Sequence, residues 1–220
     1  MKFKAAVFDM DGTLIDSLMF WSITWKEFGK KFLNDENFVP SAADEKAVRT
    51  ISLRSSVELI HKNYGIGNSA DELEEEAKKI TMDLYSSRVQ LKDGVKEFLD
   101  YCYDSGTKMC IATATAPYFV DIALKHCKIE KYFKKIFSCS EIGKGKDSPD
   151  IFLAAQEYMG FPVCDTWVFE DSEAAIQTAV KAGFNTVGIY DKFNFGHENI
   201  KKLACEYIDK GETLAKLIQA

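Results

Sequence analysis

Polar residues suited to acid–base and metal chemistry follow several short apolar runs in this 220-residue chain. Two carboxylates at the end of one buried strand repel each other unless a cation or a proton lies between them. The pairs Asp9 with Asp11 and Glu170 with Asp171 therefore predict a bound cation. Magnesium suits such a site because it binds a few carboxylates together with waters and phosphate. Thr113 ends another apolar run, and Lys146 lies in the loop before the helix predicted from Asp150, although alone they would be interpreted as a strand end and a solvated surface residue.

The elements that must position these residues alternate between strand and helix. Strands are predicted over residues 3–8, 107–113, 135–138, 166–169, 185–189 and 206–208. Helices are predicted over residues 95–104, 117–125, 150–159 and 174–181, with a final helix after residue 208. Such alternation predicts a parallel sheet covered on both faces. Ligands of these sheets bind at the carboxyl ends of the strands, where the strand order reverses, and the candidate residues stand at those ends.

The alternating pattern is interrupted by about 70 helical residues after the first strand. Trp21, Trp25, Phe28 and Phe32 follow helical spacing in this segment. Their stripe indicates packing between helices rather than stacking on a cofactor. We therefore predict an α/β protein with a Rossmann-like, doubly wound parallel core formed by residues 1–16 and 88–220. Residues 17–87 are predicted to form an inserted helical cap domain.

The composition limits the partners of the chain. Its net charge of −6 disfavours nucleic acid and anionic lipid, because both repel an acidic surface. No apolar run approaches the roughly 18 residues of a membrane span. Six scattered cysteines without a Cys-x-x-Cys pair are interpreted as reduced core residues, which predicts a cytoplasmic protein. We expect a monomer or a weak dimer.

Four segments resemble the motifs of the haloacid dehalogenase-like phosphotransferases, in the order of that family. They are Phe8–Leu14 (Phe-Asp-Met-Asp-Gly-Thr-Leu), Thr113 after Met109–Ala112, Lys146–Phe152, and Val168–Ser172. The helical insert is similar to the subclass with a C1 cap, which includes phosphoglycolate phosphatases and β-phosphoglucomutases. The resemblance covers the whole chain, and four motifs in order are far more specific than any one of them.

The resemblance implies a role for each matching residue. Asp9 would be the nucleophile that forms an aspartyl-phosphate, and Asp11 would protonate the leaving oxygen and then activate water. Magnesium would be held by Asp9, the backbone carbonyl of Asp11, Asp171 and Glu170. Thr113, Ala114 and Lys146 would bind the transferring phosphate. The implied activity is hydrolysis of a small phosphorylated metabolite.

Three alternatives to this phosphatase remain. A phosphosugar mutase needs extra cations for a second phosphate, and Ala116 and Pro117 stand where such enzymes typically carry Lys-Asn. Trp21 stands where these enzymes carry a histidine of the cap. The candidate cap contacts to substrate in this chain are Trp21, Arg49 and Arg54. A binding protein without turnover is the second alternative, but every expected catalytic position is filled. Dehalogenase chemistry is the third. The presence of Asp11 argues against it, because the dehalogenase branch lacks this second carboxylate.

Overall fold

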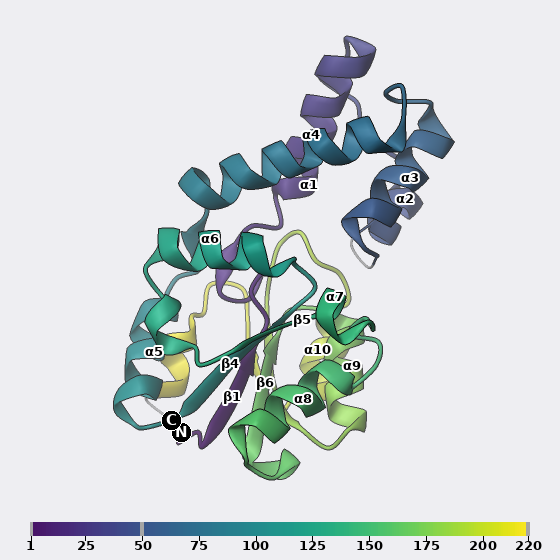
Figure 1. Cartoon of the computed structure of the whole chain (residues 1–220). Helices are drawn as coiled ribbons and strands as arrows, with labels where there is room; N and C mark the ends of the chain where they lie inside the picture. Colours follow the sequence, from purple (N-terminus) through teal and green to yellow (C-terminus); the bar gives the residue numbers. More distant parts are fainter. Residues whose placement is uncertain (1, 49–50, 219–220) are drawn as a thin grey trace. The chain divides into compact units, whose positions relative to one another are not determined.

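The computed structural model describes residues 2–48 and 51–218, which form two compact units. The first unit, the core, contains the residues up to Leu18 and from Val89 onward. The second unit, the cap, is Met19–Arg88. Figure 1 shows that the core is a twisted sheet with helices on both faces and that the cap is entirely helical. Within the described residues, no helix combines the length and the apolar character that crossing a bilayer requires.

The core sheet has six strands in the order β5-β4-β1-β6-β7-β8, and every neighbouring pair is parallel. β4 and β5 lie on one side of β1, and β6, β7 and β8 lie on the other side, so the strand order reverses at β1. Phe8 at the end of β1 lies in register with Ile111 of β4 and with Phe169 of β6. The predicted parallel α/β fold is confirmed, and the carboxyl ends of β1, β4 and β6 lie side by side at its reversal point.

The bounds of the core elements are as follows. The strands of the main sheet are β1 Ala5–Phe8, β4 Lys108–Thr113, β5 Ile136–Ser138, β6 Thr166–Glu170, β7 Asn185–Ile189 and β8 Glu206–Ile208. The helices are α5 Val95–Asp104, α6 Pro117–Cys127, α7 Cys139–Ile142, α8 Asp150–Met159, α9 Glu173–Lys181 and α10 His197–Leu203. Short 3₁₀ turns span Glu130–Tyr132, Val163–Asp165 and Leu214–Ile218.

A small antiparallel ribbon joins the core to the chain of the cap. It consists of β2 Ile15–Asp16 and β3 Gln90–Leu91, paired with Asp16 opposite Gln90. The chain leaves the core through β2 and returns through β3, so the two crossings occur at neighbouring points. Two-residue strands carry no periodicity, which is why the sequence did not predict them.

Alternation along β1 determines the two sides of the core, because successive strand residues face opposite ways. Ala5 and Val7 belong to a buried cluster with residues of α8 and α9, among them Phe152. On the other face, Phe8 stacks on Phe169 with 4.4 Å between ring centroids, and both contact Phe98 of α5. β1 is completely buried, so the chain end that it presents to the site has little freedom to move.

The cap packs around its own apolar cluster. Its helices are α1 Phe20–Phe28, α2 Ala42–Val48, α3 Leu53–Tyr64 and α4 Ala70–Asp83, and π-helical turns follow α1 at Gly29–Leu33 and α4 at Leu84–Arg88. Trp25 and Phe28 are fully buried, and Trp21 and Phe32 pack against the same cluster. The interpretation of the aromatic stripe as helix packing is confirmed.

Two expectations from the sequence are wrong. The final helix is a 3₁₀ segment at Leu214–Ile218, since the four-residue hydrogen-bonding pattern of an α-helix does not develop there. Cys164 and Cys205 are exposed rather than in the core, because Cys164 lies in the 3₁₀ turn before β6 and Cys205 lies in the connection between α10 and β8. Cys102 and Cys110 are buried as expected, and all six cysteines are free.

Candidate active site

The loop after β1 carries the first two carboxylates. Asp9 continues the strand pairing, since its N–H donates to the carbonyl of Phe169 at 2.9 Å. The chain then turns so tightly that Ile15 N–H reaches back to the carbonyl of Met10 at 3.1 Å. Gly12 adopts φ of +80° in this turn, and a Cβ there would lie 2.4 Å from Oδ2 of Asp171. Glycine is therefore required, both for the backbone conformation and for the close approach of Asp171.

Three carboxylates from two strands converge at the reversal point of the sheet. Asp9, Glu170 and Asp171 are all buried, and each offers an oxygen within 4.8 Å of the others. Burial raises the pKa of Asp9 well above its usual range against the opposing charge of Lys146. Burial also raises the pKa of Asp171 to about 7, and the charge of Glu170 adds to the rise. Grouping three buried carboxylates is unfavourable for the metal-free protein.

Lys146 offsets part of this charge. Its ammonium group contacts Oδ1 of Asp9 and lies 2.6 Å from Oε1 of Glu170. Burial lowers the pKa of Lys146, but the charges of Asp9 and Glu170 outweigh this effect and raise it overall. The second oxygen of Glu170 accepts a hydrogen bond from the backbone N–H of Ser172 at 2.7 Å. One ammonium does not balance three carboxylates, so a divalent cation with oxygen ligands fits this donor set.

Asp11 is held apart from this cluster by two hydroxyl groups. Ser17 Oγ donates to one of its carboxylate oxygens at 2.6 Å, and Thr115 Oγ1 donates to the other at 2.8 Å. Asp11 is partly exposed, unlike the three buried carboxylates. Each of its carboxylate oxygens therefore accepts a hydrogen bond from a neutral donor. The two aspartates that flank Met10 thus have different surroundings, as a nucleophile and an acid–base group would require.

The end of β4 presents a hydroxyl group and an open backbone. Thr113 is buried, and its Oγ1 accepts from the N–H of Thr115 at 3.1 Å, whereas Ala114 between them is exposed. Ala116 is the N-cap residue of α6 and Pro117 follows at its first turn, so neither supplies a side-chain donor. Thr113 and Ala114 thus lie at the end of β4, the neighbour of β1, and Lys146 reaches Asp9 and Glu170 from the loop between α7 and α8.

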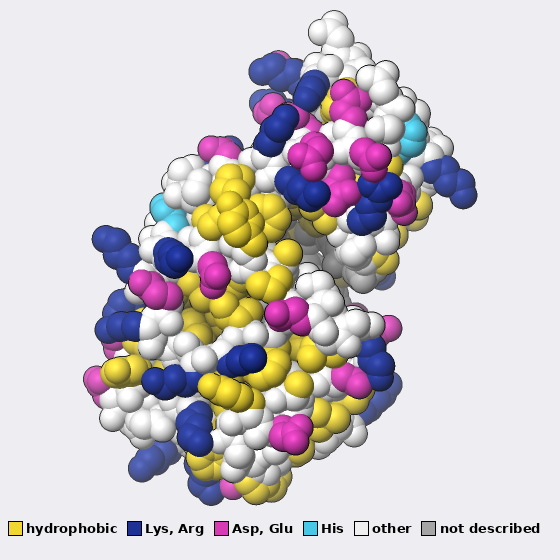
Figure 2. All heavy atoms as spheres, in the orientation of Figure 1, with side chains coloured by type: hydrophobic (Ala, Val, Ile, Leu, Met, Phe, Trp, Pro, Cys, Tyr) yellow, Lys and Arg dark blue, Asp and Glu magenta, His cyan; other side chains and the backbone are white. Residues whose placement is uncertain are grey.

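The three cap residues considered from the sequence have different surroundings. Trp21 is half-buried and stacks on Trp25 with 5.1 Å between ring centroids. Arg54 is exposed, and its guanidinium pairs with the carboxylates of Glu58, Asp71 and Glu74. Interleaved basic and acidic side chains on the cap are visible in Figure 2. A substrate anion would have to compete with three carboxylates for Arg54. Arg49 lies outside the described residues.

Sequence reasoning missed several side chains that contact the predicted carboxylates, among them Thr115 and Asn194. Thr115 could have been suspected, because it follows Thr113 by two residues in the same strand-end loop. Asn194, whose Nδ2 donates to Asp171 at 2.6 Å, carries no such signal, because it lies 23 residues further along the chain.

Three buried carboxylates at the reversal point of a parallel α/β sheet form a site whose oxygen donors are compatible with a divalent cation. The family model described as haloacid dehalogenase-like hydrolase matches residues 6–189. The chain therefore belongs to the haloacid dehalogenase-like hydrolases, and the resemblance inferred from the four motifs is confirmed.

Named relatives match over most of the chain. It is 22% identical over 216 residues to a phosphorylated carbohydrates phosphatase of Thermotoga maritima, covering 96% of each protein. It is 29% identical over 203 residues to protein CbbY of Rhodobacter capsulatus, covering 85% of each. A crystal structure of CbbY from Rhodobacter sphaeroides in complex with phosphate has a TM-score of 0.79 at 18% identity and 94% coverage of both chains, a similarity of fold.

The raised pKa of Asp171 predicts how Mg²⁺ affects stability at different pH. A carboxyl with a folded-state pKa near 7 binds more protons in the folded than in the unfolded protein between about pH 4 and 7. The free energy of unfolding of the metal-free protein should therefore fall as pH rises through this window. If the ionised carboxylates bind Mg²⁺, the cation should raise the melting temperature more at about pH 8 than at about pH 5.

Thermal melting with and without saturating Mg²⁺ at the two pH values measures this difference. Sodium chloride at matched ionic strength is the control for screening. An equal effect of Mg²⁺ at both pH values would contradict the prediction.

Proposed function

We propose that this hydrolase is a Mg²⁺-dependent phosphatase that acts on a small phosphorylated metabolite through an aspartyl-phosphate. The observation that carries the proposal is the contrast between two aspartates at the end of one strand. Asp9 lies buried against Lys146, whereas Asp11 is partly exposed and held by two hydroxyls. A nucleophile and a separate acid–base group are what hydrolysis through a covalent intermediate requires.

The roles of the individual residues are part of the proposal. Asp9 attacks phosphorus and becomes an acyl phosphate, while the proton of Asp11 passes to the leaving oxygen. Asp11 then accepts a proton from the water that attacks the phosphorus of the intermediate, which restores Asp9. Thr113, Ala114 and Lys146 bind the non-bridging oxygens through a hydroxyl, a backbone N–H and an ammonium.

Asp9, Glu170 and Asp171, with the backbone carbonyl of Asp11, are the residues that would hold Mg²⁺. When bound, the cation would reduce the repulsion between the anionic nucleophile and the phosphate. Lys146 contacts both Asp9 and Glu170, so its ammonium group compensates part of their negative charge.

The substrate class is proposed from the relatives and from the cap. The name of the Thermotoga relative specifies phosphorylated carbohydrates, which makes sugar phosphates the first compounds to test. Trp21 offers an aromatic surface, and Arg54 is compensated by three carboxylates, so we propose Trp21 as the stronger candidate for a cap contact. We further propose a reducing compartment such as the cytoplasm, because six free cysteines include two that are exposed.

Release of inorganic phosphate from a panel of metabolites tests the proposed function. The panel contains sugar phosphates, phosphoglycolate, nucleoside monophosphates and β-glucose 1-phosphate, with Mg²⁺ or with EDTA. Mg²⁺-dependent release from one or a few monoesters is the expected result. No release, together with conversion of β-glucose 1-phosphate to glucose 6-phosphate when the bisphosphate is supplied, would show a mutase instead.

Replacement of Lys146 by Met tests the phosphate site. The variant loses a charged donor that would stabilise the transferring oxygens, so kcat/KM should fall by about 10²-fold or more. Lys144→Met is a matched control two residues earlier, since Lys144 is exposed and pairs with Asp150 at the surface. Steady-state kinetics of both variants on the best substrate give the comparison. An unchanged kcat/KM in Lys146→Met would contradict the role of Lys146.

A further inference from the structure

A loop without any recognisable motif reaches the carboxylate cluster from the end of β7. Asn194 in this loop is half-buried, and its amide group points both of its N–H bonds at one residue. Nδ2 lies 2.6 Å from Oδ2 of Asp171 and 2.9 Å from the backbone carbonyl of Asp171. The side chain and the main chain of Asp171 are therefore held by the same donor group.

The orientation of the Asn194 amide is itself fixed. Its Oδ1 accepts a hydrogen bond from the backbone N–H of Phe195 at 2.9 Å, so the carbonyl side of the amide faces its own loop. The N–H side must then face Asp171. Asn194 N–H also donates to the carbonyl of Asp191 at 3.1 Å, which closes the turn that carries it.

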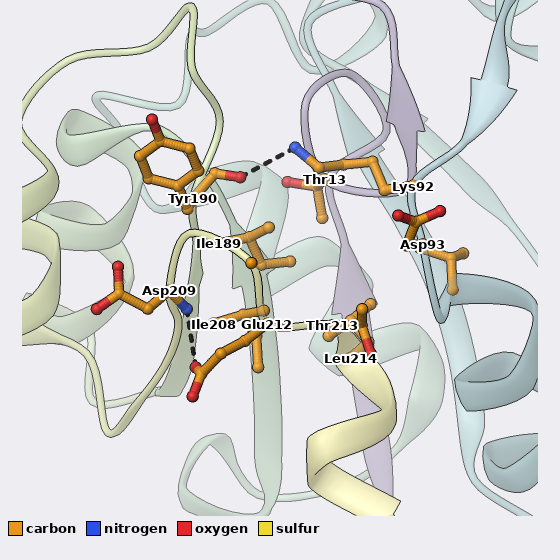
Figure 3. A pocket seen from close by; sticks show the side chains of 12 residues that line it. Thr13, Lys92, Asp93, Ile189, Tyr190, Ile208, Asp209, Glu212, Thr213 and Leu214 are labelled. Atoms are coloured by element: carbon orange, nitrogen blue, oxygen red, sulfur yellow. Dashed lines mark hydrogen bonds between the residues drawn. The ribbon is translucent and has the colours of Figure 1, made fainter.

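A buried ion pair anchors this turn to the core. Lys92 Nζ lies 2.7 Å from Oδ2 of Asp191 and 3.0 Å from the carbonyl of Tyr190, and the other Asp191 oxygen accepts from Phe193 N–H. Figure 3 shows Lys92 reaching towards Tyr190 next to Thr13, at the wall of a cavity of about 190 Å³. Asp191 is buried, so removing Lys92 would leave its carboxylate without a compensating cation, and the pair therefore stabilises this position of the loop.

The remaining freedom of Asp171 is limited from the other side. Thr13 Oγ1 donates to its Oδ1 at 3.0 Å, so each carboxylate oxygen has one neutral donor. Gly12 leaves room for Oδ2 only because it has no Cβ. Rotation of the Asp171 carboxylate would break one of these hydrogen bonds.

We propose that Asn194 is a positioning residue that orients the Asp171 carboxylate for the divalent cation. This inference rests on the metal site of the proposed function. Groups that hydrogen-bond a ligating carboxylate fix its direction, and their removal typically weakens metal binding by about 10- to 100-fold. Asn194 acts through Asp171 and contacts no substrate.

Binding of Mn²⁺ to the metal-free protein tests the proposal, because the electron paramagnetic resonance signal of free Mn²⁺ reports affinity without turnover. Asn194→Ala removes the donors, and Asn194→Leu removes them while keeping most of the side-chain volume. Both variants should bind Mn²⁺ about 10- to 100-fold more weakly. Asn199→Ala is the matched control, since Asn199 bonds Glu173, which lies outside the cluster, at 2.8 Å.

Two further measurements separate positioning from folding. The melting temperatures of the metal-free variants should stay close to that of the unaltered protein. The Mg²⁺ concentration that half-activates phosphate release should rise in both Asn194 variants, while kcat at saturating Mg²⁺ largely recovers. If Asn194→Ala does not fold, Asn194→Leu supplies the test.

Each other outcome has a definite meaning. Unchanged Mn²⁺ affinity in the folded Asn194 variants would overturn the role of Asn194 and leave the phosphatase intact. An equal loss in Asn199→Ala would overturn it too, because a change that does not touch Asp171 would then have the same effect. If the unaltered protein does not bind Mn²⁺, the metal site and the role of Asn194 are both refuted.

Discussion

Asp9→Asn should abolish phosphate release, with a loss on the order of 10⁴-fold or more, the scale on which removal of a nucleophile acts in other enzymes. An amide is a poor nucleophile and its phosphorylated form cannot turn over, so no residual route through a covalent intermediate remains. The substitution also removes one of the two carboxylates that contact Lys146. Glu170 still pairs with Lys146, and we therefore expect the variant to fold.

Phosphate release by Asp9→Asn is best measured with the substrate identified in the panel. Asp104→Asn is the control, since Asp104 is an exposed aspartate at the end of α5. Incubation of the unaltered protein with substrate, followed by acid quenching and mass analysis of the peptide that contains Asp9, should detect one added phosphoryl group. Substantial activity in Asp9→Asn, or a phosphoryl group on another residue, would refute the assignment of the nucleophile.

Asp11→Asn should lower turnover of an alkyl phosphate by about 10²- to 10⁴-fold, the range of general acid–base catalysis. Its side chain lies outside the cluster of Asp9, Glu170 and Asp171, so the variant should retain most of its affinity for Mn²⁺. The hydroxyls of Ser17 and Thr115 can still donate to the amide oxygen, which limits any structural change.

The choice of leaving group separates the two duties of Asp11. A nitrophenolate departs without protonation, so phosphorylation of Asp9 by p-nitrophenyl phosphate should be affected much less than phosphorylation by an alkyl ester. Attack of water on the intermediate still lacks its base, and the aspartyl-phosphate should accumulate after a burst of nitrophenol. Asp121→Asn, on the exposed side of α6, is the control. Turnover of an alkyl phosphate at the normal rate would contradict the acid–base role.

The sequence predicted that the candidate residues gather at one edge of the sheet, because simple rules connect strand ends to the fold. Parallel strands end at the same edge of a sheet, so residues 9, 113 and 170 had to lie near one another once their strands were recognised. Those strands are almost entirely buried, so each appears in the sequence as a short continuous apolar run. The strand order could not be predicted, because periodicity identifies strands and not their neighbours.

The features that the sequence did not predict depend on contacts between residues far apart in the chain, and no regular spacing of residues indicates such contacts. Asn194 reaches Asp171 only because Lys92 and Asp191, which lie 99 residues apart, anchor its loop. The exposure of Cys164 and Cys205 likewise depends on where their loops meet the surface. In each case tertiary contacts decide the outcome, and local composition does not report them.

The ribbon of β2 and β3 allows the cap to vary independently of the core. Asp16 and Gln90 are paired, so the 73 residues between them enter and leave the core at points about one strand spacing apart, roughly 5 Å. An insert whose two ends lie this close together can change in length or sequence without displacing the strands that hold Asp9 and Glu170. Selection on substrate preference can thus act on one segment while selection on phosphoryl chemistry acts on another, and a single catalytic edge can serve a succession of metabolites.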